Sequence, residues 1–487
     1  MRCIFILYSL FLINRLFASD IVLCPSWTIP VIEICTQNRD SIKSKDEYIS
    51  ATFKIVKNKE GGESDVFDVS IKGRGNSTWK YFDKKPYKLK FGKKIDLVGG
   101  GKSKHYALIN FCDNEYAYWD NLVGFELSRR LGMTWTPSMM PVELILNDDY
   151  LGLYFIVENI RVEKSRVNIV EQDNGEDDEA KVSGGWLLEI NNYYEDNQIY
   201  LKDNEDNTLK IQYHSPDSLS ETQLNYLANY LTIVNESVNS YDIDNSGWHN
   251  FIDGYELAKY YIVQECIDNP EGFRGSCWMY KDIGDNSKLK FGPIWDLGAG
   301  NYWRNEPRFI TDGFVVLGHK YKQFWITEIL KSNHFKQILC SMWENVRNKL
   351  DIDEYVITNY EEIKAAIVND HMRWPQYDYA YTKESMEKFL QWYKMKTDFL
   401  DSQWHDITGI INIENQKAQL KISDDQVEFT NYDCSVINVT VTNMNGIVRK
   451  LAKIGHNRYS ISPLSKGLYC ISFTIGNCNY KQIILVN

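Results

Sequence analysis

The spacing of apolar residues changes twice along the chain, and this change constrains the fold more than any other feature. Up to about residue 190 strand patterns dominate, as in the alternation of Phe67, Val69 and Ile71, a spacing typical of β-strands. One exception is residues 113–132, where a helical spacing closed by Gly132 predicts a helix. From residue 320 to 404 they follow a helical spacing in three long patterns, and after residue 410 short alternating runs return. The sequence therefore predicts an α+β fold: a β-rich first part, a helical second part and a separate small β-sandwich at residues 410–487.

The first 18 residues have the pattern of a secretory signal peptide. A short positive start at Arg2 precedes an apolar run from Cys3 to Ile13, and Ala18 supplies a small residue for cleavage. No later run of 18 apolar residues exists, so we expect no transmembrane segment in the mature chain. The expected location is outside the cell or on its surface.

Composition excludes several classes of protein. The chain has 487 residues, of which 44% are hydrophobic and 25% charged, which suits a globular protein and not a disordered one. Its net charge of -12 argues against a nucleic-acid partner. Aromatic residues reach 14%, which large cores explain more simply than stacking on glycans.

Nine cysteines remain after the signal peptide, and their spacing contains no CxxC motif, so the sequence predicts neither a zinc nor a redox site. In an oxidising compartment Cys24 could pair with Cys35, and Cys434 with Cys470 or Cys478. Sequence alone does not decide between these pairings. For the remaining cysteines of the helical part we expect small buried hydrophobic side chains, at Cys266, Cys277 and Cys340.

A cationic segment interrupts this acidic chain. Residues 72–104 contain 11 Lys or Arg against two acidic residues. They include a glycine-rich loop at residues 73–77 and a strand in which Lys88 and Lys90 lie opposite Tyr87, Leu89 and Phe91. The loop amides, with Arg74 and one strand lysine, suit a phosphate group. A solvated charged face is the alternative explanation.

Asp296 is the candidate metal ligand. It follows a buried strand and precedes a turn that contains Gly298. A carboxylate on such a turn can contact both a hard cation and a phosphate. An aspartate that only caps a turn has the same local pattern.

Six ordered blocks of the sequence resemble the CotH kinase-like family, first known from a spore coat protein. They are RGNSTW (74–79), KPYKLKF (85–91), NDDYLGLY (147–154) with Glu158 and RVNI (166–169), GGWLLE (184–189), NPEGFRGS (269–276), and GPIWD (292–296) with Gly300-Asn301. The resemblance covers roughly residues 30–405, and we take residues 24–405 as this domain. It implies an atypical protein-kinase-like fold, with a β-rich N-terminal lobe and a helical second lobe. It also implies ATP and Mg²⁺ as cofactors and transfer of phosphate to Ser or Thr of a protein.

The same resemblance implies roles for individual residues. Lys88 or Lys90 and Arg74 would bind the ATP phosphates, Glu158 would lie near the nucleotide, and Asp296 would bind Mg²⁺. The family pattern has a catalytic Asp where this chain has Glu271. Asp268, three residues earlier, is the alternative base.

A second departure from the family pattern concerns the pair Asp120-Asn121, where Arg-Asn is usual. Because of these two departures, the alternative function is that of a catalytically degenerate pseudokinase. A surface scaffold that binds glycans through Trp and Tyr is a further form of this alternative.

The C-terminal part has its own resemblance. GLYCI at residues 467–471 and KQIILVN at residues 481–487 resemble the sorting domain of type IX secretion cargo. The resemblance implies the secretion machinery as a partner. An ordinary accessory β-sandwich is the alternative.

Overall fold

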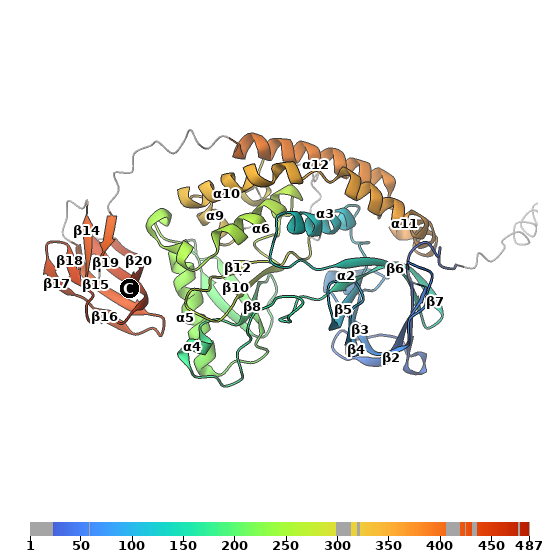
Figure 1. The fold of residues 1–487 in the computed structure, drawn as a ribbon, viewed down its shortest axis with the longest axis horizontal. Coiled ribbons are helices and arrows are strands. Elements are labelled where there is room, and N and C mark those ends of the chain that lie inside the picture. Colours follow the sequence, from blue (N-terminus) through green and yellow to red (C-terminus); the bar gives the residue numbers. More distant parts are fainter. Residues whose placement is uncertain are drawn as a thin grey trace, which may run out of the picture.

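Seven strands near the N-terminus close into a barrel in this computed structural model (Figure 1). The structure describes residues 23–298 except 58, residues 313–318 and 322–405, and residues 419–486 except 424, 431–435 and 476–477. The signal-peptide prediction and Gly300-Asn301 lie outside these residues. The barrel strands are β1 (Val31–Thr36), β2 (Ile49–Lys57), β3 (Phe67–Gly73), β4 (Tyr87–Ile95), β5 (Ser103–Ile109), β6 (Met139–Leu146) and β7 (Asp149–Glu158).

The barrel closes through a parallel pairing of β1 with β6, which places Val31 beside Glu143. All other neighbouring strands pair antiparallel, in the order β1-β2-β3-β4-β5-β7-β6. The predicted alternation is confirmed in β4, where Tyr87, Leu89 and Phe91 are buried and Lys90 is exposed. Apolar side chains thus fill the barrel, and the polar ones of each strand point outward.

A second antiparallel sheet follows in the chain, with the strand order β12-β11-β8-β10-β9. Its edge strand β12 is short and spans only Lys290–Phe291. The other strands are β8 (Trp186–Ile190), β9 (Gln198–Lys202), β10 (Thr208–Ser215) and β11 (Cys277–Lys281).

Helices cover the barrel and the second sheet along one side (Figure 1). The helix predicted within residues 113–132 is α3, which ends before Gly132 at a φ of 67°, the conformation that glycine adopts without strain. The three long helical patterns are α10, α11 and α12, as predicted. The helices are α2 (Ser77–Tyr81), α3 (Ala117–Arg130), α4 (Glu179–Val182), α5 (Glu221–Val238), α6 (Gly254–Cys266), α8 (Val315–Gly318), α9 (Ile326–Ile329), α10 (Asn333–Val346), α11 (Asp353–Arg373) and α12 (Lys383–Trp404).

Helix α11 is anchored to the barrel by a buried ion pair. Lys84 Nζ lies 2.5 Å from Asp370 Oδ1, and both side chains are buried. The amide of Leu153 on β7 donates to the same oxygen at 2.7 Å. Gly152 leaves room for this contact, because a Cβ there would stand 2.1 Å from the Asp370 carboxylate.

The C-terminal residues form two four-stranded antiparallel sheets at the end of the molecule opposite the barrel (Figure 1). Val427, Phe429 and Tyr459 of one sheet share a core with Val441 and Phe473 of the other. The strands are β13 (Gln419–Ile422), β14 (Gln426–Thr430), β17 (Ala452–Gly455) and β18 (Arg458–Ser460), and β15 (Val436–Asn443), β16 (Val448–Lys450), β19 (Gly467–Ile475) and β20 (Cys478–Val486).

Strands and helices therefore mix as the α+β prediction required. The suggested pairings Cys24–Cys35 and Cys434–Cys470 are not formed, because Cys24, Cys35 and Cys470 are free thiols. The alternative pairing of Cys434 with Cys478 lies outside the side chains that the structure describes. Cys266 and Cys277 are buried as expected, and Cys340 is half-buried. None of the described helices combines the length and the apolar character needed to cross a bilayer.

Candidate functional site

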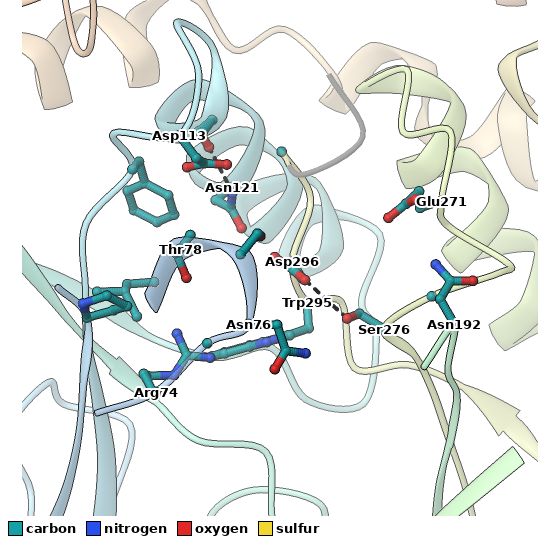
Figure 2. A pocket seen from close by; sticks show the side chains of 18 of the residues that line it. Arg74, Asn76, Thr78, Asp113, Asn121, Asn192, Glu271, Ser276, Trp295 and Asp296 are labelled. Atoms are coloured by element: carbon teal, nitrogen blue, oxygen red, sulfur yellow. Dashed lines mark hydrogen bonds between the residues drawn. The ribbon is translucent and has the colours of Figure 1, made fainter. Parts of the chain in front are cut away.

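A cavity of about 350 Å³ lies where the barrel meets the second sheet (Figure 2). The loop between β3 and α2 and the segment after β5 supply lining residues on the barrel side. The end of β8 and the loop at residues 271–276 supply lining residues on the sheet side. Three of the predicted site residues, Arg74, Glu271 and Asp296, are brought together here.

The glycine-rich loop supplies one wall, although fewer of its amides are free than the sequence suggested. The amide of Gly73 donates to Ser44 O at 2.8 Å, and that of Arg74 to Pro86 O at 3.2 Å. Gly75 has a φ of 84°, which a residue with a Cβ rarely adopts. The loop thus turns sharply and presents Arg74 and Asn76 to the cavity.

Arg74 is the cation of this wall. Its guanidinium carbon lies 5.7 Å from the ring centroid of Trp295. Burial lowers the pKa of Arg74, and the negative charge of Asp296 raises it in turn. Because an arginine stays protonated in proteins, this side chain offers fixed positive charge within reach of a bound anion.

Asp296 presents an exposed carboxylate from a turn that α3 holds in place. Its backbone has a φ of 58°, and its Oδ2 accepts a hydrogen bond from Ser276 Oγ at 3.1 Å. The next amide, of Leu297, donates to Asn121 Oδ1 at 3.3 Å. Leu297 also packs on Gly124, where a Cβ would stand 2.1 Å from its Cδ1. The turn is therefore rigid, while the carboxylate itself remains open to a ligand.

Glu271 lies on the opposite side of the cavity (Figure 2). Its Oε1 is 3.4 Å from Arg274 NH1, and its side chain is 28% exposed. The loop that carries it is fixed on both sides of the glutamate. The amide of Glu271 donates to Asn269 Oδ1 at 3.2 Å, and Gly272 O accepts from Tyr260 OH at 2.8 Å.

Asp268, the alternative base, does not line the cavity. Its Oδ1 lies 3.6 Å from Lys396 Nζ, and Glu265 Oε2 lies 3.3 Å from the same nitrogen. All three side chains are fully buried. Glu265 also accepts the amides of Val315 and Val316. We therefore assign Asp268 to a buried ionic cluster that joins α6 to α12.

The remaining predicted residues also lie away from the cavity lining. Lys88 is on the outer face of the barrel, where burial and the charges of Lys72, Arg161 and Arg74 lower its pKa to about 8. Lys90 is exposed on the same face. Glu158 is buried at the end of β7, 3.8 Å from Arg166 Nε, and accepts the amide of Ser138 at 2.9 Å.

Sequence reasoning missed two carboxylates of the cavity. Asp113, in the segment between β5 and α3, has a pKa raised to about 7, chiefly by burial and further by the charge of Asp296. Glu189, on β8, lies 2.7 Å from His214 Nε2 through its Oε2. The GGWLLE block contained Glu189, but its strand position gave no sign of which side faces a cavity.

Asn121 belongs to the lining, and its neighbour Asp120 is fully buried. The Nδ2 of Asn121 donates to Ala117 O at 2.8 Å. The departure from the family pattern at Asp120 therefore lies beneath the cavity, one residue from the side chain that holds the Asp296 turn.

The charges of the lining determine what it can bind. Among the described residues it contains one cationic side chain, Arg74, and four acidic ones, Asp113, Glu189, Glu271 and Asp296. Carboxylate and hydroxyl oxygens are the ligands that Mg²⁺ prefers, so Asp296, with Ser276 and Asp113 nearby, fits that ion. A polyphosphate needs such a cation here, because four carboxylates would otherwise repel it.

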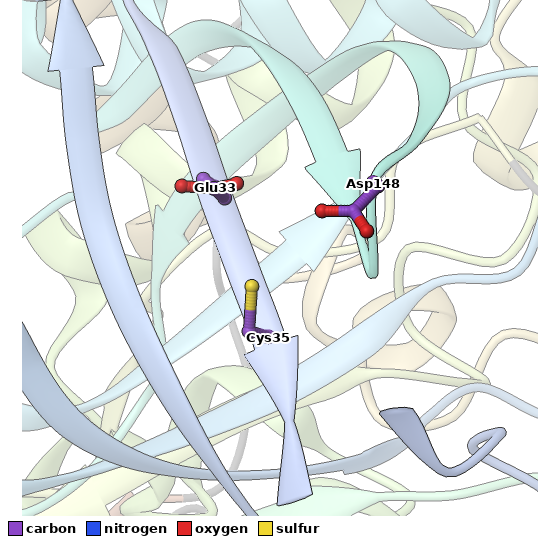
Figure 3. A group of neighbouring side chains, drawn as sticks. All are labelled: Glu33, Cys35 and Asp148. Atoms are coloured by element: carbon purple, nitrogen blue, oxygen red, sulfur yellow. The ribbon is translucent and has the colours of Figure 1, made fainter. Parts of the chain in front are cut away.

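A second group of metal-ligand residues lies on the barrel (Figure 3). Glu33, Cys35 and Asp148 place ligand atoms within 4.8 Å of one another. Arg39 forms an ion pair with Asp148, and burial together with Glu33 raises the pKa of the Cys35 thiol. A metal ligand must be a thiolate, so these contacts oppose metal binding and we assign no site there.

A loop with a cation, a turn with an exposed aspartate and a facing carboxylate thus line one cavity. A family model described as CotH kinase protein matches residues 71–400, which is more than half of the chain. The chain therefore belongs to the CotH kinase family. No curated protein matches it in a sequence search.

Proposed function

We propose that the protein is an exported, ATP- and Mg²⁺-dependent phosphotransferase that acts on Ser or Thr of a secreted or surface protein. One observation carries this proposal: Arg74, Glu271 and Asp296, from three separate family motifs, converge on one cavity. Membership of a kinase family supports a protein as the acceptor.

Each residue has a role that its surroundings support. Asp296 would hold Mg²⁺, with Asp113 and Ser276 as further oxygen donors, and the ion when bound neutralises phosphate charge. Arg74 would bind a phosphate oxygen through a charge-assisted hydrogen bond. Glu271 would accept the proton of the acceptor hydroxyl. Trp295, beneath the guanidinium of Arg74, restricts where that cation can move.

Export and sorting belong to the same proposal. The pattern of residues 1–18 supports a signal peptide. The short strands of the C-terminal sheets are compatible with a domain that the type IX secretion machinery recognises. An export assay of the full chain and of a chain that ends at residue 405 would test both parts, since only the first should reach the cell surface.

A nucleotide-binding pseudokinase is the second candidate, and the position of Arg274 favours it. This arginine stands 3.4 Å from the Glu271 carboxylate, so it competes for the oxygen that a catalytic base would offer to the acceptor hydroxyl. Under this alternative the cavity binds Mg²⁺-ATP without transferring phosphate.

The test is incubation of the purified protein with labelled ATP and Mg²⁺, followed by detection of label in the protein and in added acceptor proteins. Calorimetry with Mg²⁺-ATP accompanies it, on the wild type and on Asp296→Asn. We expect the substitution to abolish Mg²⁺-dependent nucleotide binding and leave the fold intact. Asp285→Asn, at an exposed aspartate outside the cavity, is the matched control.

Three outcomes have distinct meanings. Binding together with transfer supports the kinase. Binding without transfer from wild type and from Glu271→Asp supports the pseudokinase. Unchanged Mg²⁺-ATP affinity in a folded Asp296→Asn variant contradicts the metal assignment.

A further inference from the structure

Exposed tyrosines and amide side chains gather beside the mouth of the cavity, around the loop between β8 and β9. Tyr193, Tyr194 and Tyr200 are 51%, 77% and 51% exposed. Amide side chains stand between them on the same loop and on β9. We name this surface the tyrosine–amide shelf and define it as Asn192, Tyr193, Tyr194, Asn197, Gln198 and Tyr200.

The shelf is held in shape by its own contacts. The rings of Tyr194 and Tyr200 lie 6.3 Å apart at an angle of 31°, and Lys210 Nζ stands 3.7 Å from the Tyr194 centroid. Gln198 donates to Tyr193 O at 2.9 Å and accepts from Tyr200 OH at 3.1 Å. Side chains that are already ordered lose little entropy when a ligand binds.

The shelf and the cavity lining share two residues. Asn192 and Tyr193 belong to both, and Asn192 packs on the loop that carries Glu271. A Cβ on Gly275 would stand 2.4 Å from Asn192 Nδ2, so this close contact depends on the glycine. Lys210 Nζ also donates to Asn192 O at 2.6 Å, which ties the exposed rings to the lining.

The chemistry of the shelf selects among ligands. Flat ring faces bind a flat apolar surface, while Asn and Gln side chains both donate and accept hydrogen bonds, as hydroxyl groups do. A sugar ring offers both features. A nucleic acid would need an excess of cations, but Lys210 is outnumbered here by the neighbouring Glu195 and Asp196.

We propose that the tyrosine–amide shelf binds a carbohydrate chain, which lies across Tyr194 and Tyr200 and reaches the cavity mouth at Tyr193. Saccharide binding at this surface does not depend on phosphoryl transfer. A further consequence, that the acceptor of the kinase carries carbohydrate, rests on the proposed function.

The experiment is calorimetry of the full chain with three probes: cellohexaose, xylohexaose and the hexamer of N-acetylglucosamine. We expect at least one probe to bind, and Tyr194→Ala and Tyr200→Ala each to weaken it about tenfold, the effect of losing one stacked ring. Both tyrosines are exposed, so their removal should leave the melting temperature unchanged. Tyr255→Ala, at a 62% exposed tyrosine of α6 outside the shelf, is the matched control.

A further measurement on a site variant distinguishes failure of this inference from failure of the proposed function. Asp296→Asn should bind the saccharide like the wild type even where it no longer binds Mg²⁺-ATP. The inference is overturned if no probe binds with a Kd below about 10 mM. It is also overturned if both tyrosine variants bind like the wild type, or if these tyrosines hold only an unglycosylated acceptor peptide.

Discussion

Asp268 and Glu271 stand three residues apart on one loop, and the structure gives their carboxylates opposite surroundings. Asp268 is fully buried beside Lys396, with Glu265 on the same ammonium group. Glu271 is partly exposed in a cavity, where its carboxylate pairs with Arg274. Asp268 and Glu271 carry the same charge but have different roles. The buried Asp268 contributes to stability, whereas Glu271 is accessible from the cavity and is therefore the candidate catalytic residue.

Removal of the buried cation should have the largest effect. In Lys396→Met, Glu265 and Asp268 lose their positive partner while remaining buried, which costs about 3–5 kcal/mol of unfolding free energy. Urea denaturation measures the loss. Lys388→Met on the same helix is the control, because this lysine is 48% exposed and solvent screens its ion pair. Equal stability of the two variants would contradict the role of the cluster.

Glu271→Gln should abolish function without loss of stability. A positioned base contributes about a hundredfold or more to the rate, so labelled phosphate transfer should fall by at least that factor. Mg²⁺-ATP binding and the melting temperature should stay at wild-type values. Glu271→Asp, which restores the family residue, should raise the rate if the longer side chain is what limits it. An active Glu271→Gln enzyme would remove this residue from the mechanism.

The third prediction compares the cation of the cavity with those of the outer barrel face. Arg74→Met should weaken Mg²⁺-ATP binding about ten- to a hundredfold, the value of one charge-assisted contact. Lys88→Met and Lys90→Met should change it by less than about threefold, because only screened long-range attraction is lost. Calorimetry on the three variants decides the matter. If Lys88 or Lys90 bound the phosphates, its substitution would weaken Mg²⁺-ATP binding more than Arg74→Met does.

The smallest effect concerns Asp113, whose pKa is raised to about 7 mainly by burial. Between about pH 4 and pH 7 the folded chain keeps this proton and the unfolded chain has lost it, so stability falls as the pH rises. Asp113→Asn removes this dependence. Without divalent ions, the stability of the variant relative to wild type should rise from pH 5 to pH 8.

Solvent reaches this wall of the cavity and screens the charge, so the rise should be on the order of 1 kcal/mol. Melting curves at the two pH values measure it. The Asp285→Asn control should show no such rise, and a difference that stays constant for Asp113→Asn would contradict the raised pKa.

Much of this arrangement could be predicted from local patterns. Alternation gave the strands, and glycine-containing motifs gave the turns that position Arg74 and Asp296. The orientation of Lys88 could not be predicted, because alternation shows that it lies opposite Tyr87 without showing which side faces a ligand. The answer depends on closure of the barrel, which joins β1 to a strand more than a hundred residues later.

The missed carboxylates have a similar cause. Asp113 stands in an irregular segment, and its importance arises from contact with the turn at Asp296, which the chain reaches much later. Asp268 has the residue type of a kinase base and lies three residues from Glu271, so the sequence allows it as the alternative base. Its pairing with Lys396 on α12 could not be read from either segment alone.

The Lys84–Asp370 pair has a consequence for how the chain is made. Lys84 lies just before the barrel strand β4, but its only short-range counter-charge among the described residues is supplied from α11, at residue 370. During synthesis the barrel strands emerge long before that helix, and until it docks Lys84 must remain hydrated. The contact between Lys84 and Asp370 therefore forms only after α11 has been made. A nascent chain shorter than about 370 residues would leave this region open to proteases and to chaperones.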